Sequence, residues 1–148
     1  MIRKAIIDER SIGFLSGAVK KTFEYLAEKE ANEENSVYLS YQDLISYLEN
    51  EYIFENPEEI KRFLVNNEDL IEILFSATDH IREIFGNVPL YLELHHDPEE
   101  GWDELFIVIK TNYPAEKAVE LESKLFENWF VKVLNKVKGR LNFTEEPL

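Results

Sequence analysis

The 148-residue sequence contains no cysteine. This absence excludes disulfide bonds, thiolate catalysis and cysteine-ligated zinc sites, although it says little about the compartment. Apolar runs are short, and the longest clear one, Leu105–Ile109, is far below the roughly 18 residues that cross a membrane. The N-terminal segment MIRKAIIDER has too few consecutive apolar residues for a signal peptide. We therefore expect a cytoplasmic protein that makes no contact with membranes.

Positive charge is also scarce. Lys and Arg number 16 against 30 Asp and Glu, which gives a formal net charge of −14. Because nucleic-acid phosphates are neutralised by clustered Lys and Arg, we expect no binding to DNA or RNA. The acidity favours solubility or, alternatively, an acidic face for a basic partner. One basic cluster lies at the end of an expected helix, where cations complement the helix dipole: Lys132, Lys136, Lys138 and Arg140.

The first half of the chain, residues 1–86, has the periodicity of amphipathic helices. The first expected helix covers residues 12–29. Three more helices are expected after it, at a capping-box pattern formed by Ser40 and Asp43, after Asn56-Pro57, and from Asn67 to Gly86.

The second half, residues 87–148, changes to the two-residue alternation of strands. A hairpin is predicted from the two runs LYLELHH and ELFIVIK, which are joined by a turn that contains Pro98 and Gly101. A long helix follows from Pro114 to Gly139, and the segment RLNFT resembles a further strand. We predict a single α+β domain over residues 1–148. Its helical half packs on a hairpin–long helix–strand half that has a small, mainly antiparallel sheet.

Two adjacent histidines of the hairpin lie among five carboxylates: Glu93, Asp97, Glu99, Glu100 and Asp103. If Leu94 pairs with Leu105, His95 lies opposite Glu104, and His96 lies near Asp103 on the face of the leucines. Adjacent strand residues point to opposite faces, so the two histidines cannot easily share a metal ion. We therefore expect no metal and no cofactor. Any metal ion would use Glu93 and His95, which share a face.

The hairpin face opposite the leucines carries the apolar residues Tyr91, Phe106 and Val108. We expect helices of the first half to cover it, and the alternative is contact with a partner. Aromatic residues set among carboxylates are typical of interfaces with a polar rim. Candidate partner-binding residues are therefore Tyr52, Phe54, Trp102, Tyr91 and Phe106. Of the two tryptophans, Trp129 is expected in the core and Trp102 at the surface.

Known catalytic motifs are missing from the sequence. It has no Gly-rich phosphate loop, no serine elbow and no His-Glu-x-x-His helix, and Val108 replaces the acid that a Glu-x-Lys nuclease strand requires before Lys110.

About the last 60 residues resemble a group of small prokaryotic proteins of unassigned function. The shared elements are a strand, an Asp-Pro-Glu turn, a second strand, a Pro-started helix with Trp and a short final strand. They correspond to Asp97, Pro98, Glu99, Pro114, Trp129 and Leu141. The resemblance implies no activity, but it implies an accessory protein, such as the non-toxic member of a toxin–antitoxin-like pair.

We expect a non-enzymatic protein, monomeric or homodimeric, that binds a basic protein partner. The alternatives are a metal-dependent hydrolase that uses the region of His95, Glu93 and Asp97, and a binder of a small ligand.

Overall fold

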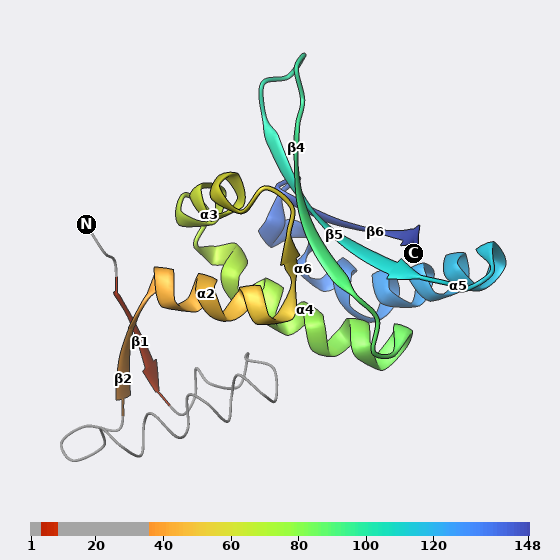
Figure 1. The fold of residues 1–148 in the computed structure, drawn as a ribbon, viewed down its shortest axis with the longest axis horizontal. Coiled ribbons are helices and arrows are strands. Elements are labelled where there is room, and N and C mark those ends of the chain that lie inside the picture. Colours follow the sequence, from red (N-terminus) through yellow and green to blue (C-terminus); the bar gives the residue numbers. More distant parts are fainter. Residues whose placement is uncertain (1–3, 9–35) are drawn as a thin grey trace.

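The computed structural model describes residues 4–8 and 36–148 and confirms an α+β fold (Figure 1). The helix expected over residues 12–29 lies outside the described residues. None of the described helices combines the length and the apolar character needed to cross a membrane. The elements, in chain order, are β1 (Lys4–Asp8), β2 (Ser36–Ser40), α2 (Tyr41–Glu51), β3 (Ile53–Phe54), α3 (Pro57–Val65), α4 (Asp69–Phe85), β4 (Leu90–His96), β5 (Asp103–Thr111), α5 (Ala115–Leu125), η2 (Phe126–Phe130), α6 (Val131–Val137) and β6 (Leu141–Pro147).

The central sheet has the strand order β3-β4-β5-β6. The hairpin of β4 and β5 has the predicted register, with Leu94 opposite Leu105 and His95 opposite Glu104. The prediction of a mainly antiparallel sheet is wrong, because β3 pairs with β4 and β6 pairs with β5 in parallel. The physical reason lies in the connection between β5 and β6. The helical segment α5–η2–α6 returns the chain to the starting end of the sheet, as a parallel crossover requires.

The first half is not purely helical. Strands β1 and β2 form an antiparallel pair, and β3 joins the edge of the central sheet. The described helices of this half begin and end close to the predicted positions. Ser40 and Asp43 form the expected capping box at the start of α2. Gly86 follows α4 with a φ of 85°, a conformation that glycine adopts without steric cost. Asn56 precedes α3, but its side chain makes no capping hydrogen bond.

The core lies between the helices and the leucine face of the sheet. Leu92, Leu105 and Ile107 have no exposed surface. Trp129 is 3% exposed, and its ring stacks on His80 with centroids 5.8 Å apart. This confirms the expected core position of Trp129. Trp102 is 45% exposed, as expected for a residue of the turn.

The opposite face of the hairpin is only partly buried. Tyr91 and Phe106 are partly exposed. Val108 is buried, but it does not belong to the main cluster of core residues. The core residues of α2, α3 and α4 join the leucine face instead. The cover that we expected from the first-half helices is therefore not supplied by these three described helices.

Candidate protein-binding surface on the hairpin

The hairpin turn after β4 is held by hydrogen bonds. Asp97 accepts hydrogen bonds through Oδ1 from the backbone N–H groups of Glu99 and Glu100, both at 2.9 Å. Its own backbone N–H donates to the carbonyl oxygen of Trp102 at 2.9 Å. Gly101 closes the turn with a φ of 71°. Oδ1 of Asp97 therefore stabilises the turn.

The two histidines point to opposite sides of the sheet, as their alternation predicted. Nδ1 of His96 lies 2.5 Å from Oδ1 of Asp103, and Nε2 lies 3.5 Å from a carboxylate oxygen of Glu59 on α3. These carboxylates, Asp103 first, raise the pKa of His96. On the other side, the His95 ring packs against Phe106 with centroids 4.4 Å apart.

Glu93 lies next to His95, with 3.3 Å between its carboxylate oxygen and Nε2. Glu93 and His95 are the two residues that the sequence analysis named as ligands of any metal ion. Among the described residues, no three His, Asp or Glu side chains are gathered in a way that could hold a metal ion.

A shallow cleft of about 460 Å³ lies beside the turn. Aromatic rings and carboxylates both line it. The lining residues are His95, His96, Asp97, Pro98, Glu99, Trp102, Glu104 and Phe106. Such a combination suits a cationic group, since a cation is attracted by ring faces and by carboxylates.

Glu104 is the carboxylate of this cleft that is partly removed from water. Burial raises the pKa of Glu104, and the neighbouring His95 lowers it. Among the described residues, none donates a hydrogen bond to its carboxylate. A cation that entered the cleft would therefore be stabilised by a carboxylate that has lost part of its hydration.

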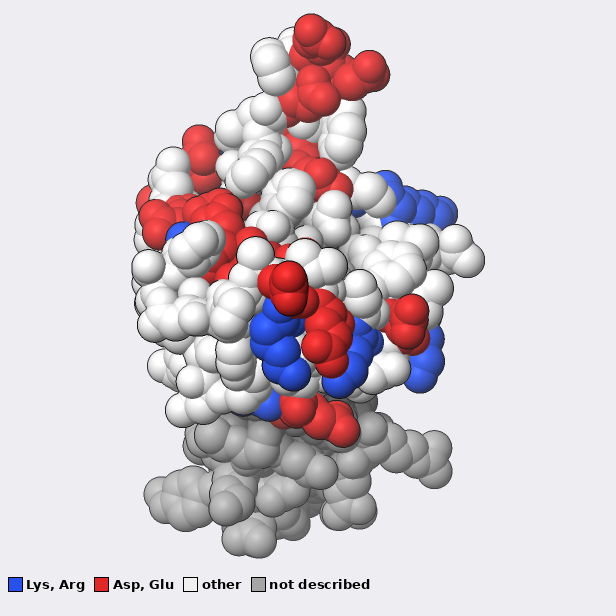
Figure 2. All heavy atoms as spheres, turned by 90° about the vertical axis from the view of Figure 1, so that its right-hand side faces the viewer, with Lys and Arg blue, Asp and Glu red and all other residues white. Residues whose placement is uncertain are grey.

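The projecting end of the hairpin, residues 93–106, contains no Lys or Arg, whereas Lys110 lies near the other end of β5 and pairs with Glu146. The chain contains no Lys or Arg between Arg82 and Lys110. Figure 2 shows acidic side chains at the tip of the projecting end of the hairpin, with no Lys or Arg visible on that end. Its carboxylates are those of Glu93, Asp97, Glu99, Glu100, Asp103 and Glu104. The resulting field attracts basic surfaces and repels acidic ones.

The candidate residues predicted from the sequence separate into two groups. Trp102, Tyr91 and Phe106 are at least partly exposed on the hairpin. Tyr52 and Phe54 are buried in the core, so they are not available for contact with a partner. The hydroxyl of Tyr52 donates to the carbonyl oxygen of Leu74 at 2.6 Å, and burial raises the pKa of Tyr52.

Ile53 belongs to the candidate surface, although the sequence analysis did not single it out. It is exposed, and it pairs with Tyr91 in the register of β3 and β4. It therefore shares the face of Tyr91 rather than that of the leucines. The alternation in the segment Tyr52-Ile53-Phe54 was the available signal, because the two aromatic residues point one way and Ile53 points the other.

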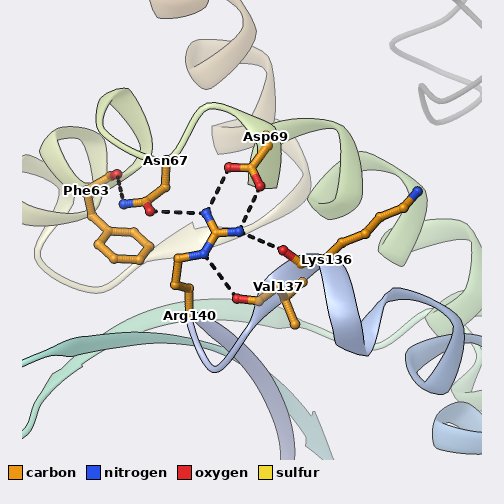
Figure 3. A network of polar contacts seen from close by, with 6 residues as sticks. All are labelled: Phe63, Asn67, Asp69, Lys136, Val137 and Arg140. Atoms are coloured by element: carbon orange, nitrogen blue, oxygen red, sulfur yellow. Dashed lines mark hydrogen bonds and ion pairs between the residues drawn. The ribbon is translucent and has the colours of Figure 1, made fainter.

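A second cleft of about 360 Å³ lies on the other side of the hairpin, next to α3. Several of its polar groups are already paired, including Arg140 with Asn67 and His96 with Asp103 and Glu59. Arg140 forms a two-pronged contact with Asp69, with both N–O distances at 2.8 Å, and also donates to Asn67 at 3.2 Å (Figure 3). These contacts join the end of α6 to the start of α4, so this cleft is bordered by a structural network.

Arg140 also completes the C-terminal end of α6. Its guanidinium donates to the carbonyl oxygens of Val137 at 3.1 Å and Lys136 at 2.7 Å (Figure 3). The structural role expected for this basic residue is therefore confirmed. Its three basic neighbours in the sequence, Lys132, Lys136 and Lys138, have exposed side chains.

Comparison of the chain with models of protein families, with curated proteins and with solved structures gives no match. The resemblance to small prokaryotic proteins therefore stays a prediction.

Proposed function

We propose that the protein is a non-enzymatic, cytoplasmic binding protein that takes up a basic segment of another protein on its hairpin. A Lys or Arg side chain of the partner enters the cleft between Trp102, Phe106 and Glu104. The observation that carries the proposal is this cleft, in which a partly desolvated carboxylate faces aromatic rings at the end of the hairpin that has no Lys or Arg. An accessory role, such as that of an antitoxin-like protein, agrees with the resemblance of the C-terminal part.

The energetics of such a contact are modest for one side chain. A cation over an aromatic ring contributes about 0.5–1 kcal/mol at an exposed site and about 2 kcal/mol when water is excluded. Useful affinity therefore needs further contacts, which Tyr91 and Ile53 offer on the same face of the sheet. The acidic tip contributes mainly to the rate of association, because long-range attraction steers a basic partner toward it.

The proposal is tested by selecting peptides from a random displayed library on the folded protein and measuring their affinity. We expect enrichment of peptides with Lys or Arg next to apolar residues. Their affinity should fall steeply as salt rises from about 50 to 500 mM, because screening weakens exposed charge pairs. Trp102→Ala and Glu104→Gln should each weaken binding. A matched control, Glu72→Gln, removes one exposed carboxylate of α4 and should leave binding unchanged.

Fluorescence gives a direct second readout. The chain has two tryptophans, so the Trp129→Phe variant leaves Trp102 as the single emitter. A bound peptide should shift the Trp102 emission and protect it from a soluble quencher. Enriched peptides that lack basic residues would contradict the proposal. It would also be contradicted by basic peptides whose binding ignores both Trp102→Ala and Glu104→Gln.

A further inference from the structure

A second exposed apolar surface lies on the long helical segment between β5 and β6. Phe126 is 40% exposed, Val131 47% and Leu134 43%. These side chains belong to η2 and α6, which follow each other without a break. Large apolar residues grouped on one element mark interaction sites more often than single exposed ones do.

The π-helical turn η2 explains why apolar residues point outward here. The backbone N–H of Val131 bonds to the carbonyl oxygen of Phe126, five residues earlier, which is the hydrogen bond of a π-helix. The wider turn buries the adjacent pair Trp129 and Phe130. Phe126 then lies over Phe130, with ring centroids 6.0 Å apart, and keeps its outer surface exposed.

Residues 126–138 of the same helical segment carry three exposed lysines and one exposed carboxylate, that of Glu127. Lys132, Lys136 and Lys138 are exposed, and no carboxylate of the described residues forms an ion pair with them. The lysine of α5 nearest to them in sequence, Lys124, is different because it pairs with Glu120. We name the apolar residues Phe126, Val131 and Leu134, together with Lys132, Lys136 and Lys138, the basic helical surface.

The hairpin has the complementary properties. Its tip presents an exposed Trp102 beside the carboxylates of Glu99 and Glu100, and residues 93–106 contain no Lys or Arg. A net charge of −14 makes two copies repel each other at long range, so their association depends on local contact between opposite charges. The acidic hairpin tip and the basic helical surface are present in every copy at equal concentration. Both surfaces remain exposed within one chain.

We propose that the hairpin of one copy docks on the basic helical surface of a second copy. The proposal rests on the proposed function in one respect, because it uses the hairpin as the element that binds positive charge. In a two-fold dimer the contact is made twice, with each hairpin on the other copy's α6. Self-association of this kind also occupies the cleft, so a basic protein partner competes with the second copy.

Charge reversal with mixing tests the proposal. The hairpin reversal is Glu99→Lys with Glu100→Lys, and the helix reversal is Lys132→Glu with Lys136→Glu. The wild-type mass should rise with concentration in analytical ultracentrifugation at low salt. Each reversal alone places like charges against each other and should weaken self-association at least tenfold. An equal mixture of the two variants places opposite charges together at both contacts and should restore it.

The controls separate folding, charge and function. Circular dichroism melts show whether each variant is folded, and Glu72→Lys with Glu83→Lys gives the same charge change outside the hairpin. A wild-type protein that stays monomeric would overturn the proposal. So would a mixture that does not associate, or self-association that survives both reversals.

The outcome for peptide binding distinguishes the two proposals. The helix reversal leaves the hairpin intact, so it should bind basic peptides as the wild type does. If peptides bind the hairpin while the wild type is monomeric, the self-docking is refuted and the proposed function stands. If the mixture associates while no basic peptide binds, a foreign basic partner is refuted and the self-docking stands.

Discussion

Replacing Trp129 by alanine tests the placement of the long helical segment. The residue is 3% exposed, stacks on His80 and meets Phe130 edge-on at 5.7 Å. A buried Trp removes about 150–250 Å² from water, which at about 25 cal/mol per Å² corresponds to ~4–6 kcal/mol. The alanine retains a little of this, and measured core truncations of large aromatics cost about 3–5 kcal/mol. We expect a loss in that range for Trp129→Ala.

Trp102→Ala is the matched control, because it removes the same atoms from an exposed turn position. We expect it to change the free energy of unfolding by less than about 1 kcal/mol. Urea unfolding followed by far-UV circular dichroism measures both variants without depending on tryptophan emission. The urea dependence should be unchanged, so that the midpoint reports stability.

Domains of this size have a total stability of only about 5–15 kcal/mol, so the Trp129 variant loses a large part of it. Trp129→Phe retains a ring and should lose less. Equal losses at both tryptophans, or a larger loss at Trp102, would refute the assignment of η2 to the core.

Two further predictions concern charged contacts. Because the carboxylates of Asp103 and Glu59 raise the pKa of His96, its charged form should stabilise the fold below about pH 6.5, and this contribution should be lost as pH rises through the raised pKa. The stability difference between wild type and His96→Gln should therefore be larger at about pH 5.5 than at about pH 8.5 in urea unfolding. Arg140→Met should cost about 0.5–1.5 kcal/mol, because the exposed Asp69 and the Lys136 carbonyl lose this donor, whereas the Val137 carbonyl keeps the backbone N–H of residue 140.

The Arg140 prediction has an independent readout. The guanidinium lowers the pKa of Asp69, so the pair stabilises the fold above the ordinary Asp pKa and stops doing so as pH falls through the lowered value. In Arg140→Met, an NMR titration should show the Asp69 pKa raised toward its ordinary value. Lys132→Met is the control and should leave both stability and the Asp69 pKa unchanged. A His96→Gln difference that grows with pH would contradict the sign of the histidine prediction.

Local patterns in the sequence were sufficient for the hairpin and the helix ends. The register of β4 and β5 follows from strict alternation of leucines with polar residues, and the capping box at Ser40 needs only four consecutive positions. Trp129 was placed in the core by the apolar lines of one long helix. These features depend on neighbours in the sequence, which is why they could be predicted.

Contacts between distant segments could not be predicted in this way. The residue pattern of β6 predicted a strand but not its direction relative to β5. The long helix before β6 already requires a parallel return of the chain. Arg140 and Asp69 are 71 positions apart, and no local pattern pairs them. Tyr52 and Phe54 were misplaced because their carboxylate neighbours resembled an interface, whereas pairing of β3 with β4 turns Phe54 inward.

The free edge of β6 bears on how a partner can bind. Leu105 donates to Arg140, and Leu148 donates to Thr111, so even-numbered residues of β6 turn their backbone groups toward β5. The odd-numbered residues therefore turn their backbone groups to the free edge. The outward N–H of Phe143 is occupied by Oδ1 of Asn142 at 2.8 Å.

Pro147, which also faces the free edge, has no N–H to offer. Such features prevent an added strand from pairing along β6, as they do on protected edges of other sheets. The opposite edge is β3, which has two residues and is too short to guide a partner strand. Addition of a strand is therefore disfavoured at both edges of the central sheet. A partner protein would bind through contacts with side chains instead. The hairpin supplies these with exposed rings and carboxylates on an element that projects beyond the helices (Figure 1).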